Sequence, residues 1–200
     1  KLIEKTAEIL NNGKKIVILV GQGALNASEE VIDVAQKLNA PIIKAMLGKA
    51  VVPDDHPHSL GGIGFLGTEP SSDAMAESDT LFMVGTSFPY IEYLPRPGQA
   101  TGIQIDIKPE KIGLRYPVEI GLIGDSKQVL SDLIPLLHDR RTDKQDNDTS
   151  AEFLKSKQYA MKKWNDVLNE QSSRLDEPIK PQVVAAAVSN ELDDNAIISV

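Results

Sequence analysis

The fold is decided by the stretch Thr80-Leu81-Phe82-Met83-Val84-Gly85-Thr86-Ser87-Phe88-Pro89-Tyr90, which is followed closely by Gly102-Ile103-Gln104-Ile105-Asp106-Ile107. Each begins as a nearly continuous apolar run, which is typical of a parallel strand buried on both faces. The first run ends in Gly85, Thr86 and Ser87, which offer backbone N–H groups and two hydroxyls, and the second ends in an acid, Asp106. Ligands of open α/β sheets bind outside the carboxyl ends of the strands. The two strands therefore predict a nucleotide cleft.

Apolar runs and amphipathic helices alternate around these two strands. Further strands are predicted at 15–20, 41–45 and 117–123, and helices at 2–10, 28–38 and 125–137. Ser28 and Asp125 are the expected N-caps of the last two helices, and Ser71 and Ser72 are expected to cap a short helix. The glycine-rich segment 46–70 shows no periodicity and is interpreted as an ordered binding loop. The alternation predicts an α/β fold in three layers, α/β/α, with a mostly parallel sheet.

The second part of the chain has a different character. Residues 139–150 are almost entirely polar and predict a linker, while 151–171 and 181–188 carry helical apolar stripes. The chain closes on the apolar run 195–200, interpreted as a strand with no turn after it. We therefore expect one domain over 1–138, a linker over 139–150, and a tail over 151–200 that begins another domain of a longer polypeptide.

Composition narrows the classes of function. The apolar fraction of 41% supports a packed core, and the aromatic fraction of 4% with a net charge of −8 argues against nucleic-acid partners. No stretch approaches the ~20 apolar residues of a membrane span, nothing at the start is typical of a signal peptide, and there is no cysteine for thiol catalysis. We expect a soluble, cytoplasmic protein with no sign of membrane association.

Two other motifs are weak. Gly21-Gln22-Gly23 is half of a dinucleotide fingerprint, but Asn26 occupies the place of the third glycine and Lys44-Ala45 stand where an acid is expected. A tight turn is slightly favoured over phosphate contact there. His56 and His58 lie near two aspartates, yet an inert loop is favoured over a metal site. We predict no catalytic residue and no metal ligand in this chain.

Several of these segments together resemble the central domain of thiamine-diphosphate-dependent enzymes. They are Ile18–Ala24, Gly48-Lys49, the 61–67 glycine loop, Gly85–Tyr90 and Gln104–Ile107. The type that they resemble most is pyruvate oxidase, or the related quinone-linked pyruvate dehydrogenase. The resemblance covers residues 1–138 and continues through the linker into the start of the third domain of that family. It implies a nucleotide-binding fold of the DHS-like kind, followed by a helical tail.

The resemblance also implies an FAD site. In this site, backbone groups would pass beside the ribityl and diphosphate of the flavin, and hydroxyl and N–H groups would donate hydrogen bonds to the same region. Further residues would pack nearby, and a carboxylate would accept hydrogen bonds from the adenosine ribose. In order along the chain these residues are Gly62, Ile63, Gly64, Phe65, Gly85, Thr86, Ser87, Phe88, Pro89 and Asp106. Asp125 is expected near the adenine.

What the resemblance implies for the whole protein is oxidation of pyruvate, with thiamine diphosphate and Mg²⁺ held by domains outside this chain. The isolated chain is therefore expected to be inactive, and the complete protein to be a dimer or tetramer. Two alternatives stay open. One is the structural central domain of an acetolactate synthase-like or decarboxylase-like enzyme that binds no flavin. The other is an unrelated nucleotide-binding or deacetylase-like domain.

Overall fold

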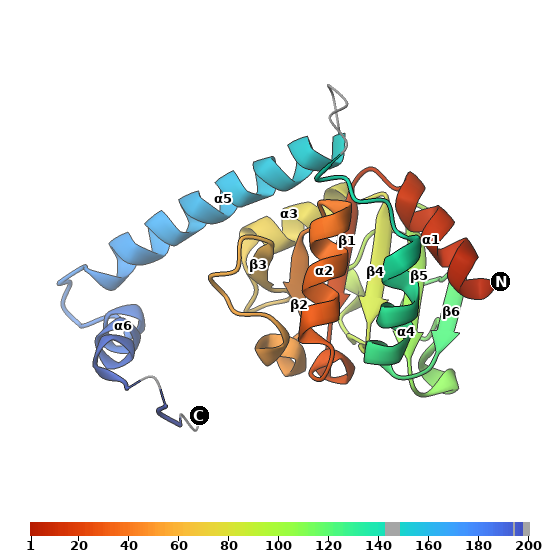
Figure 1. Ribbon diagram of the computed structural model, residues 1–200. Coiled ribbons are helices and arrows are strands. Elements are labelled where there is room, and N and C mark those ends of the chain that lie inside the picture. Colours follow the sequence, from red (N-terminus) through yellow and green to blue (C-terminus); the bar gives the residue numbers. More distant parts are fainter. Residues whose placement is uncertain (143–148, 194, 198–200) are drawn as a thin grey trace. The chain divides into compact units, whose positions relative to one another are not determined.

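The computed structural model describes residues 1–142, 149–193 and 195–197. The chain divides into two compact units, Lys1–Tyr159 and Ala160–Val200. The first unit holds a single sheet with the strand order β3-β2-β1-β4-β5-β6 (Figure 1). Its strands are β1 (Ile16–Val20), β2 (Ile42–Lys44), β3 (Ser59–Gly62), β4 (Thr80–Val84), β5 (Thr101–Asp106) and β6 (Ile120–Ile123). Every neighbouring pair is parallel, which confirms the predicted α/β fold.

Helices cover both faces of this sheet. On one face lie α1 (Leu2–Asn12), α2 (Ser28–Leu38) and α4 (Ser126–Leu133), and on the other lies α3 (Glu69–Glu77) (Figure 1). The alternation of side chains along a strand explains this arrangement. In β1, Ile16, Ile18 and Val20 join the core beneath α1, α2 and α4, while Val17 and Leu19 are buried on the opposite face. All five residues of β1 are buried, as expected for a central strand.

Short 3₁₀ helices connect several of these elements. They are η1 (Gln22–Ala24), η2 (Met46–Val51), η3 (Ile91–Tyr93), η4 (Pro109–Lys111) and η5 (Ile134–Leu136). Four of them, η1, η2, η3 and η4, are the next elements after the strands β1, β2, β4 and β5. At that edge of the sheet the chain therefore continues from several strands into short 3₁₀ turns.

The interpretation of 46–70 as one uninterrupted loop was wrong. This segment contains η2 and the edge strand β3, which pairs with β2 through Ser59 and Gly62. Ser59-Leu60-Gly61-Gly62 has little intrinsic strand preference. It becomes a strand because β2 leaves an unpaired edge, where Ile42 N donates to His58 O at 2.7 Å and Ile63 N donates to Lys44 O at 3.1 Å.

Two of the predicted caps also differ from the structure. The N-cap of α2 is Ala27 and Ser28 is its first residue. The N-cap of α3 is Thr68, whose hydroxyl accepts from Ser71 N at 3.2 Å, so that helix begins before Ser71 and Ser72. The cap at Asp125 is confirmed, because its carboxylate accepts from Gln128 N at 3.2 Å. The strand predicted from 117 begins only at Ile120.

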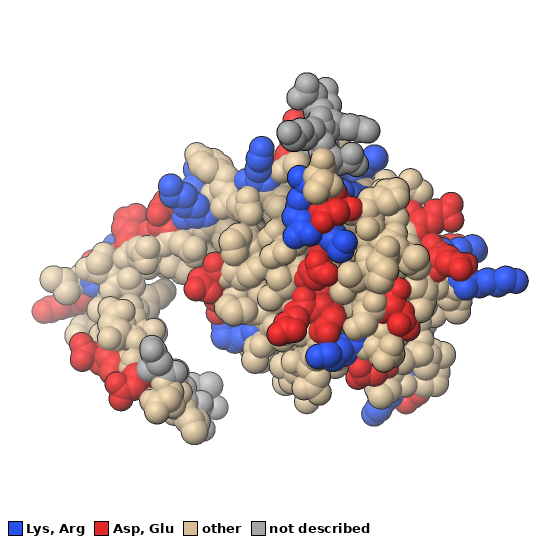
Figure 2. Space-filling model, viewed as in Figure 1, with Lys and Arg blue, Asp and Glu red and all other residues tan. Residues whose placement is uncertain are grey.

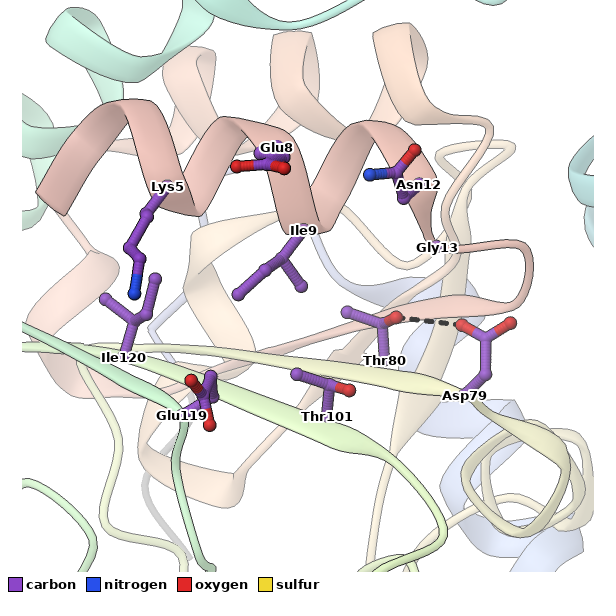
Figure 3. Close-up of a pocket in the computed structure, with 10 residues that line it drawn as sticks. All are labelled: Lys5, Glu8, Ile9, Asn12, Gly13, Asp79, Thr80, Thr101, Glu119 and Ile120. Carbon is purple, nitrogen blue, oxygen red and sulfur yellow. Dashed lines mark hydrogen bonds between the residues drawn. The ribbon is translucent and has the colours of Figure 1, made fainter. Parts of the chain in front are cut away.

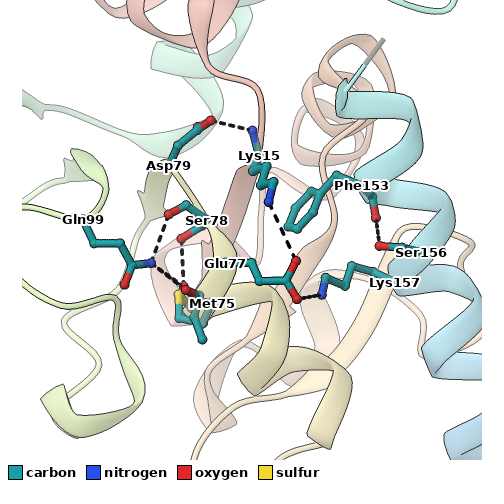
Figure 4. A network of polar contacts seen from close by, with 10 residues as sticks. Lys15, Met75, Glu77, Ser78, Asp79, Gln99, Phe153, Ser156 and Lys157 are labelled. Atoms are coloured by element: carbon teal, nitrogen blue, oxygen red, sulfur yellow. Dashed lines mark hydrogen bonds and ion pairs between the residues drawn. The ribbon is translucent and has the colours of Figure 1, made fainter. Parts of the chain in front are cut away.

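The first unit extends to Tyr159 because the first turns of α5 (Thr149–Ser172) pack on it. Figure 4 shows the contact: Lys157 Nζ lies 2.7 Å from Glu77 Oε1 and 5.3 Å from the centre of the Phe153 ring. Nearby, Gln99 donates to the carbonyls of Ala76 and Ser78, at 2.9 and 3.1 Å, where α3 ends.

The polar segment after residue 138 is anchored at its beginning. The guanidinium of Arg140 donates to the carbonyls of Leu10 and Asn11, in the last turn of α1, and to that of Gly13 just after the helix, at 2.8, 3.1 and 2.8 Å. Residues 143–148 of the predicted linker lie outside the described residues. The assignment of 151–200 to a following domain stays a prediction.

The second unit contains the rest of α5 and α6 (Pro181–Glu191). Pro181 stands at the start of α6, where its missing N–H costs no hydrogen bond. Residues 195–197 form no strand, and 198–200 of the predicted strand lie outside the described residues. Within the described part of the chain, no helix combines the length and the apolar character needed to cross a membrane.

Candidate functional site

A cleft of about 630 Å³ lies at the carboxyl edge of the sheet in the first unit. We call it the edge cleft. Its lining comes from the segments that follow five strands: Ala45–Leu47 after β2, Gln22, Gly23 and Asn26 after β1, Gly85–Tyr90 after β4, Asp106–Lys108 and Lys111 after β5, and Gly124–Ser126 after β6. Its volume falls in the roughly 300–1,000 Å³ range of small-molecule sites.

The topology of the sheet explains why the cleft forms here. From β1 the chain moves outward to β2 and β3, and it then returns to the other side of β1 to build β4, β5 and β6. The loops after β1 and β4 therefore leave the sheet in opposite directions. This switch point is where open α/β sheets bind their ligands.

Gly23 and Gly85 close the bottom of the cleft by packing on each other. Gly23 N donates to Gly85 O at 2.9 Å. Gly85 has φ +60°, and a Cβ on it would lie 2.4 Å from the carbonyl carbon of Gly23. The glycine turn after β1 thus serves close backbone packing. Moreover, α2 begins only at Ser28, after η1, so this turn does not open directly into an α-helix as the dinucleotide fingerprint requires.

Gln104, in β5, holds two walls of the cleft together. This side chain is 2% exposed. Its Nε2 donates to Thr86 O at 3.3 Å and to Lys111 O at 3.0 Å, while its Oε1 accepts from Gly113 N at 2.9 Å. The turn after β4 and the loop after β5 are therefore fixed relative to each other by one buried amide.

Asp106 stands at the end of β5 with one carboxylate oxygen engaged. Its Oδ1 accepts from Lys108 N at 3.0 Å, and among the described residues its other oxygen accepts no hydrogen bond. Lys108 and Lys111 line the same end of the cleft. This end can therefore receive hydroxyl donors at the carboxylate and anionic groups at the ammonium groups. Asp125 also lines it, although its Oδ1 caps α4.

The opposite end of the cleft is apolar. Met46 and Leu47 are 72% and 70% exposed. Phe88 and Tyr90 come from the segment after β4, and their rings lie 5.5 Å apart with an edge-to-face orientation. The order of the strands separates this end from Asp106, because β2 and β5 are not neighbours. The cleft thus runs from a charged end to an apolar end.

Part of the sequence-predicted site is assembled here. Gly85, Thr86, Ser87, Phe88, Pro89 and Asp106 line the edge cleft, whereas Gly62, Ile63, Gly64 and Phe65 do not. The second group lies beside it: Gly64, with φ +102°, would place a Cβ 3.4 Å from Phe88 Cζ, and Phe65 is 91% exposed. The contact of these residues with a ligand stays a prediction.

Sequence reasoning missed the residues that close the two ends of the cleft, among them Met46, Leu47, Tyr90, Lys108 and Lys111. A positional signal could have found Met46 and Leu47. They follow β2 as Gly85 and Thr86 follow β4, and the residues after parallel strands gather on one edge. They were not recognised as site residues because apolar side chains are equally typical of a helix that packs in the core.

A second cavity, of about 540 Å³, lies at the amino edge of the sheet between α1 and the starts of β4, β5 and β6 (Figure 3). One of the acids that line it, Asp79, already has hydrogen-bond partners. The Asp79 carboxylate accepts from Lys14 N at 3.0 Å, from Lys15 N at 2.9 Å and from the Thr80 hydroxyl at 2.8 Å. We interpret this carboxylate as an anchor for the start of β1.

The two loop histidines have structural partners. His58 Nδ1 lies 2.9 Å from Ala40 O, and His56 Nδ1 accepts from His58 N at 3.2 Å. Burial lowers the pKa of His58, against the opposing effect of its bond to Ala40. Within the described ranges, no three histidine, aspartate or glutamate side chains lie close enough together to hold a metal ion.

Charge is unevenly spread over the first unit. Figure 2 shows acidic side chains gathered over the outer surface of α2 and α4. The acids of these helices include Glu29, Glu30, Asp33 and Asp132, with Lys127 paired to Glu30 at 3.5 Å. An anionic ligand thus meets cations at the charged end of the cleft rather than over these helices.

The first unit is an open parallel α/β sheet with a cleft at its switch point, and comparison with known proteins identifies its family. The family model described as "Thiamine pyrophosphate enzyme, central domain" matches residues 3–133. The chain is 41% identical over 194 residues to the Bacillus subtilis "Putative thiamine pyrophosphate-containing protein YdaP", covering 97% of this chain and 32% of that protein. It is 32% identical over 194 residues to the acetolactate synthase large subunit of Haemophilus influenzae, covering 93% of this chain and 32% of the relative.

Comparison with solved structures agrees with this result. An X-ray structure of a "putative thiamin diphosphate-dependent enzyme" from Mycobacterium smegmatis matches with a TM-score of 0.57 and 29% identity, covering 68% of this chain and 27% of that chain. The chain belongs to the thiamine-diphosphate-dependent enzymes, as their central domain. It spans about a third of the length of the curated relatives that it matches.

Proposed function

We propose that this chain is the central domain of an acetolactate synthase-like enzyme that acts on a 2-oxo acid such as pyruvate. The acetolactate synthase of Haemophilus influenzae supports this proposal, because it aligns with 93% of the chain. A Methanocaldococcus jannaschii relative named "Probable acetolactate synthase large subunit" adds support, with 33% identity over 210 residues. The pyruvate oxidase interpretation is narrower, and none of these relatives carries that description.

The family match removes one alternative, an unrelated nucleotide-binding or deacetylase-like domain. Thiamine diphosphate would supply the chemistry on the 2-oxo acid, and we propose that domains outside this chain hold it with Mg²⁺. The part of this chain would then be to bind a second group, or to serve as a spacer. Assembly of the complete protein into dimers or tetramers is also a proposal, which a mass measurement in solution tests.

We further propose that the edge cleft binds an adenine dinucleotide, with FAD as the preferred candidate. The observation that supports this proposal is the change in the lining of the cleft from a charged end to an apolar end. Asp106 has a carboxylate oxygen available for ribose hydroxyls, and Lys108 and Lys111 can meet a diphosphate. At the other end, Met46, Leu47 and Tyr90 can pack against a planar ring. The residues that line the cleft are therefore chemically suited to FAD. When bound, FAD would supply a redox-active ring, while these residues bind and orient it.

The complete protein provides the test. It should be supplied with thiamine diphosphate, Mg²⁺ and pyruvate, and its product and its visible absorbance should both be measured. Acetolactate as the product, together with flavin absorbance in the purified or FAD-reconstituted protein, is the expected result. Acetolactate without flavin binding would favour the spacer alternative. Acetate or acetyl phosphate formed with an electron acceptor would favour the pyruvate oxidase interpretation.

A further inference from the structure

Lys44 is a lysine buried in the sheet. It ends β2, and only 2% of the residue is exposed. Its ammonium group donates to Val52 O at 2.7 Å and forms an ion pair with Asp54. Buried lysines without a partner are rare, because removing the charge from water is costly. Both partners lie in the segment that follows η2, so the side chain reaches from the sheet to a loop.

Asp54 joins this buried cation to a second, exposed one. Its other carboxylate oxygen lies 2.7 Å from Lys49 Nζ, and Lys49 belongs to η2. Although partial burial raises the pKa of Asp54, its hydrogen bonds with Lys44 and Lys49 outweigh this effect and leave the pKa below its usual value. The carboxylate is therefore charged at neutral pH, and each of its two oxygens is paired with a lysine.

The segment held in this way is a wall of the edge cleft. Met46 and Leu47 line the cleft at the start of η2. Next to them, Gly48 approaches the end of β1 so closely that a Cβ on it would lie 2.6 Å from Val20 O. At the other end of η2, the Val52 carbonyl receives its hydrogen bond from Lys44. The backbone of η2 is thus held at both ends, by close packing at Gly48 and by the hydrogen bond from Lys44 to the Val52 carbonyl.

We propose that Lys44 is a positioning residue that holds the η2 wall of the edge cleft and thereby sets affinity for the apolar part of a bound dinucleotide. The proposal rests on the proposed nucleotide cleft. An apolar side chain of similar length fills the same volume, but it cannot donate to the Val52 carbonyl or pair with Asp54. The contact at the Asp106 end of the cleft does not depend on Lys44, since β5 and β2 are separated by β1 and β4.

The experiment compares Lys44→Met with Lys49→Met in the complete protein. Lys49→Met is the matched control, because it removes the exposed partner of Asp54 and leaves the buried pair intact. Hydrogen exchange is measured over residues 46–58 and over β5 and α4. Affinities are measured for two probes, FAD and ADP, where ADP lacks the flavin ring.

For Lys44→Met we expect amide exchange over 46–58 to be about ten- to a hundredfold faster than in the parent. FAD should bind more weakly by a similar factor. This factor corresponds to the typical free-energy contribution of a hydrogen bond to a charged group. Exchange in β5 and α4, and the affinity for ADP, should stay at the parent values. Lys49→Met should resemble the parent. A role confined to overall stability would change exchange throughout the unit and weaken both probes alike.

Unchanged exchange over 46–58 in Lys44→Met would overturn the proposal, as would equal losses of FAD and ADP affinity. If Lys44→Met does not fold, Asp54→Asn provides the second variant, because it keeps the Val52 contact and removes the carboxylate charge. Exchange over 46–58 should be faster in Asp54→Asn than in the parent, but by a smaller factor than expected for Lys44→Met because the Val52 contact remains. Exchange at the parent rate would also overturn the proposal. If the parent binds neither probe, the nucleotide cleft itself is refuted, and the exchange comparison alone decides whether Lys44 holds the wall.

Discussion

At the scale of single residues, the close approach of two backbone segments restricts which side chains are tolerated at the bottom of the cleft. Gly85 combines φ +60° with a position where a Cβ would lie 2.4 Å from the backbone of Gly23. Gly98 also has positive φ, +85°, but a Cβ there would meet nothing within 4 Å. Substitutions at these two glycines therefore distinguish the cost of backbone strain, which both would have, from the cost of steric overlap, which only Gly85 would have.

We expect Gly85→Ala to lower the free energy of unfolding by at least about 2 kcal/mol, because left-handed strain and overpacking add together. Gly98→Ala should lose only about 1 kcal/mol, from strain alone. Urea denaturation of the two variants measures the difference. Equal losses would mean that the turn after β4 can move away from Gly23 without cost.

Histidine burial predicts a pH dependence of stability. Burial is the main cause that lowers the pKa of both His56 and His58 below the ordinary value of 6.5. The unfolded chain then binds more protons than the folded one as the pH falls through this range, so the free energy of unfolding should decrease below about pH 6.5. Urea midpoints between pH 7 and 5 should show this decrease in the parent and a smaller one in His58→Gln. Identical slopes would contradict the assignment to His58.

At the scale of elements, a buried aromatic ring and the ammonium groups beside it are among the contacts that hold the start of α5 to the first unit. Phe153 is 4% exposed, and the ammonium groups of Lys15 and Lys157 lie 6.0 and 5.3 Å from its ring centre. Phe153→Ala should cost about 3 kcal/mol and accelerate amide exchange over 149–159. Lys155→Ala, on the exposed side of the same helix, should change neither quantity. If exchange over 149–159 is unaffected by Phe153→Ala, other contacts hold the helix.

The elements that can be predicted from sequence are those with strong periodicity. β1 and β4 are recognisable because they are almost unbroken apolar runs, and β5 because its isoleucines flank Gln104 and it ends in an acid. α2 and α4 are recognisable because their apolar stripes repeat at helical spacing. The edge strand β3 escapes prediction because Ser59, Gly61 and Gly62 give it neither alternation nor β-branched residues. Its structure comes from pairing with β2, which is a tertiary effect that local sequence does not encode.

The site can be predicted only in part, for a related reason. Strand ends that carry glycine, hydroxyls or an acid are visible in the sequence, and Gly85–Pro89 with Asp106 do lie together. Gly62–Phe65 are placed in the site by resemblance alone, and the loop after β3 lies beside the cleft instead. Lys44 stands out in the sequence only as a departure from a fingerprint, since its burial depends on Val52 and Asp54.

At the scale of the whole molecule, we propose that the chain works as part of a larger enzyme. Because it spans about a third of its relatives, we expect the isolated 200 residues to show no turnover of pyruvate with added thiamine diphosphate, Mg²⁺ and FAD. The complete protein serves as the positive control under the same conditions. Measurable turnover by the isolated chain would place thiamine chemistry in this domain and refute the proposed division of labour.

The most direct test of the nucleotide site is a titration of the complete, nucleotide-free protein with FAD, followed by flavin fluorescence. We predict saturable binding in the parent, and a loss of about ten- to a hundredfold in affinity for Asp106→Ala, which removes a charged acceptor for ribose hydroxyls. Ser87→Ala should cost less, since neighbouring backbone N–H groups remain. No binding by the parent, or equal affinity in Asp106→Ala, would contradict the claim that the edge cleft is a nucleotide site.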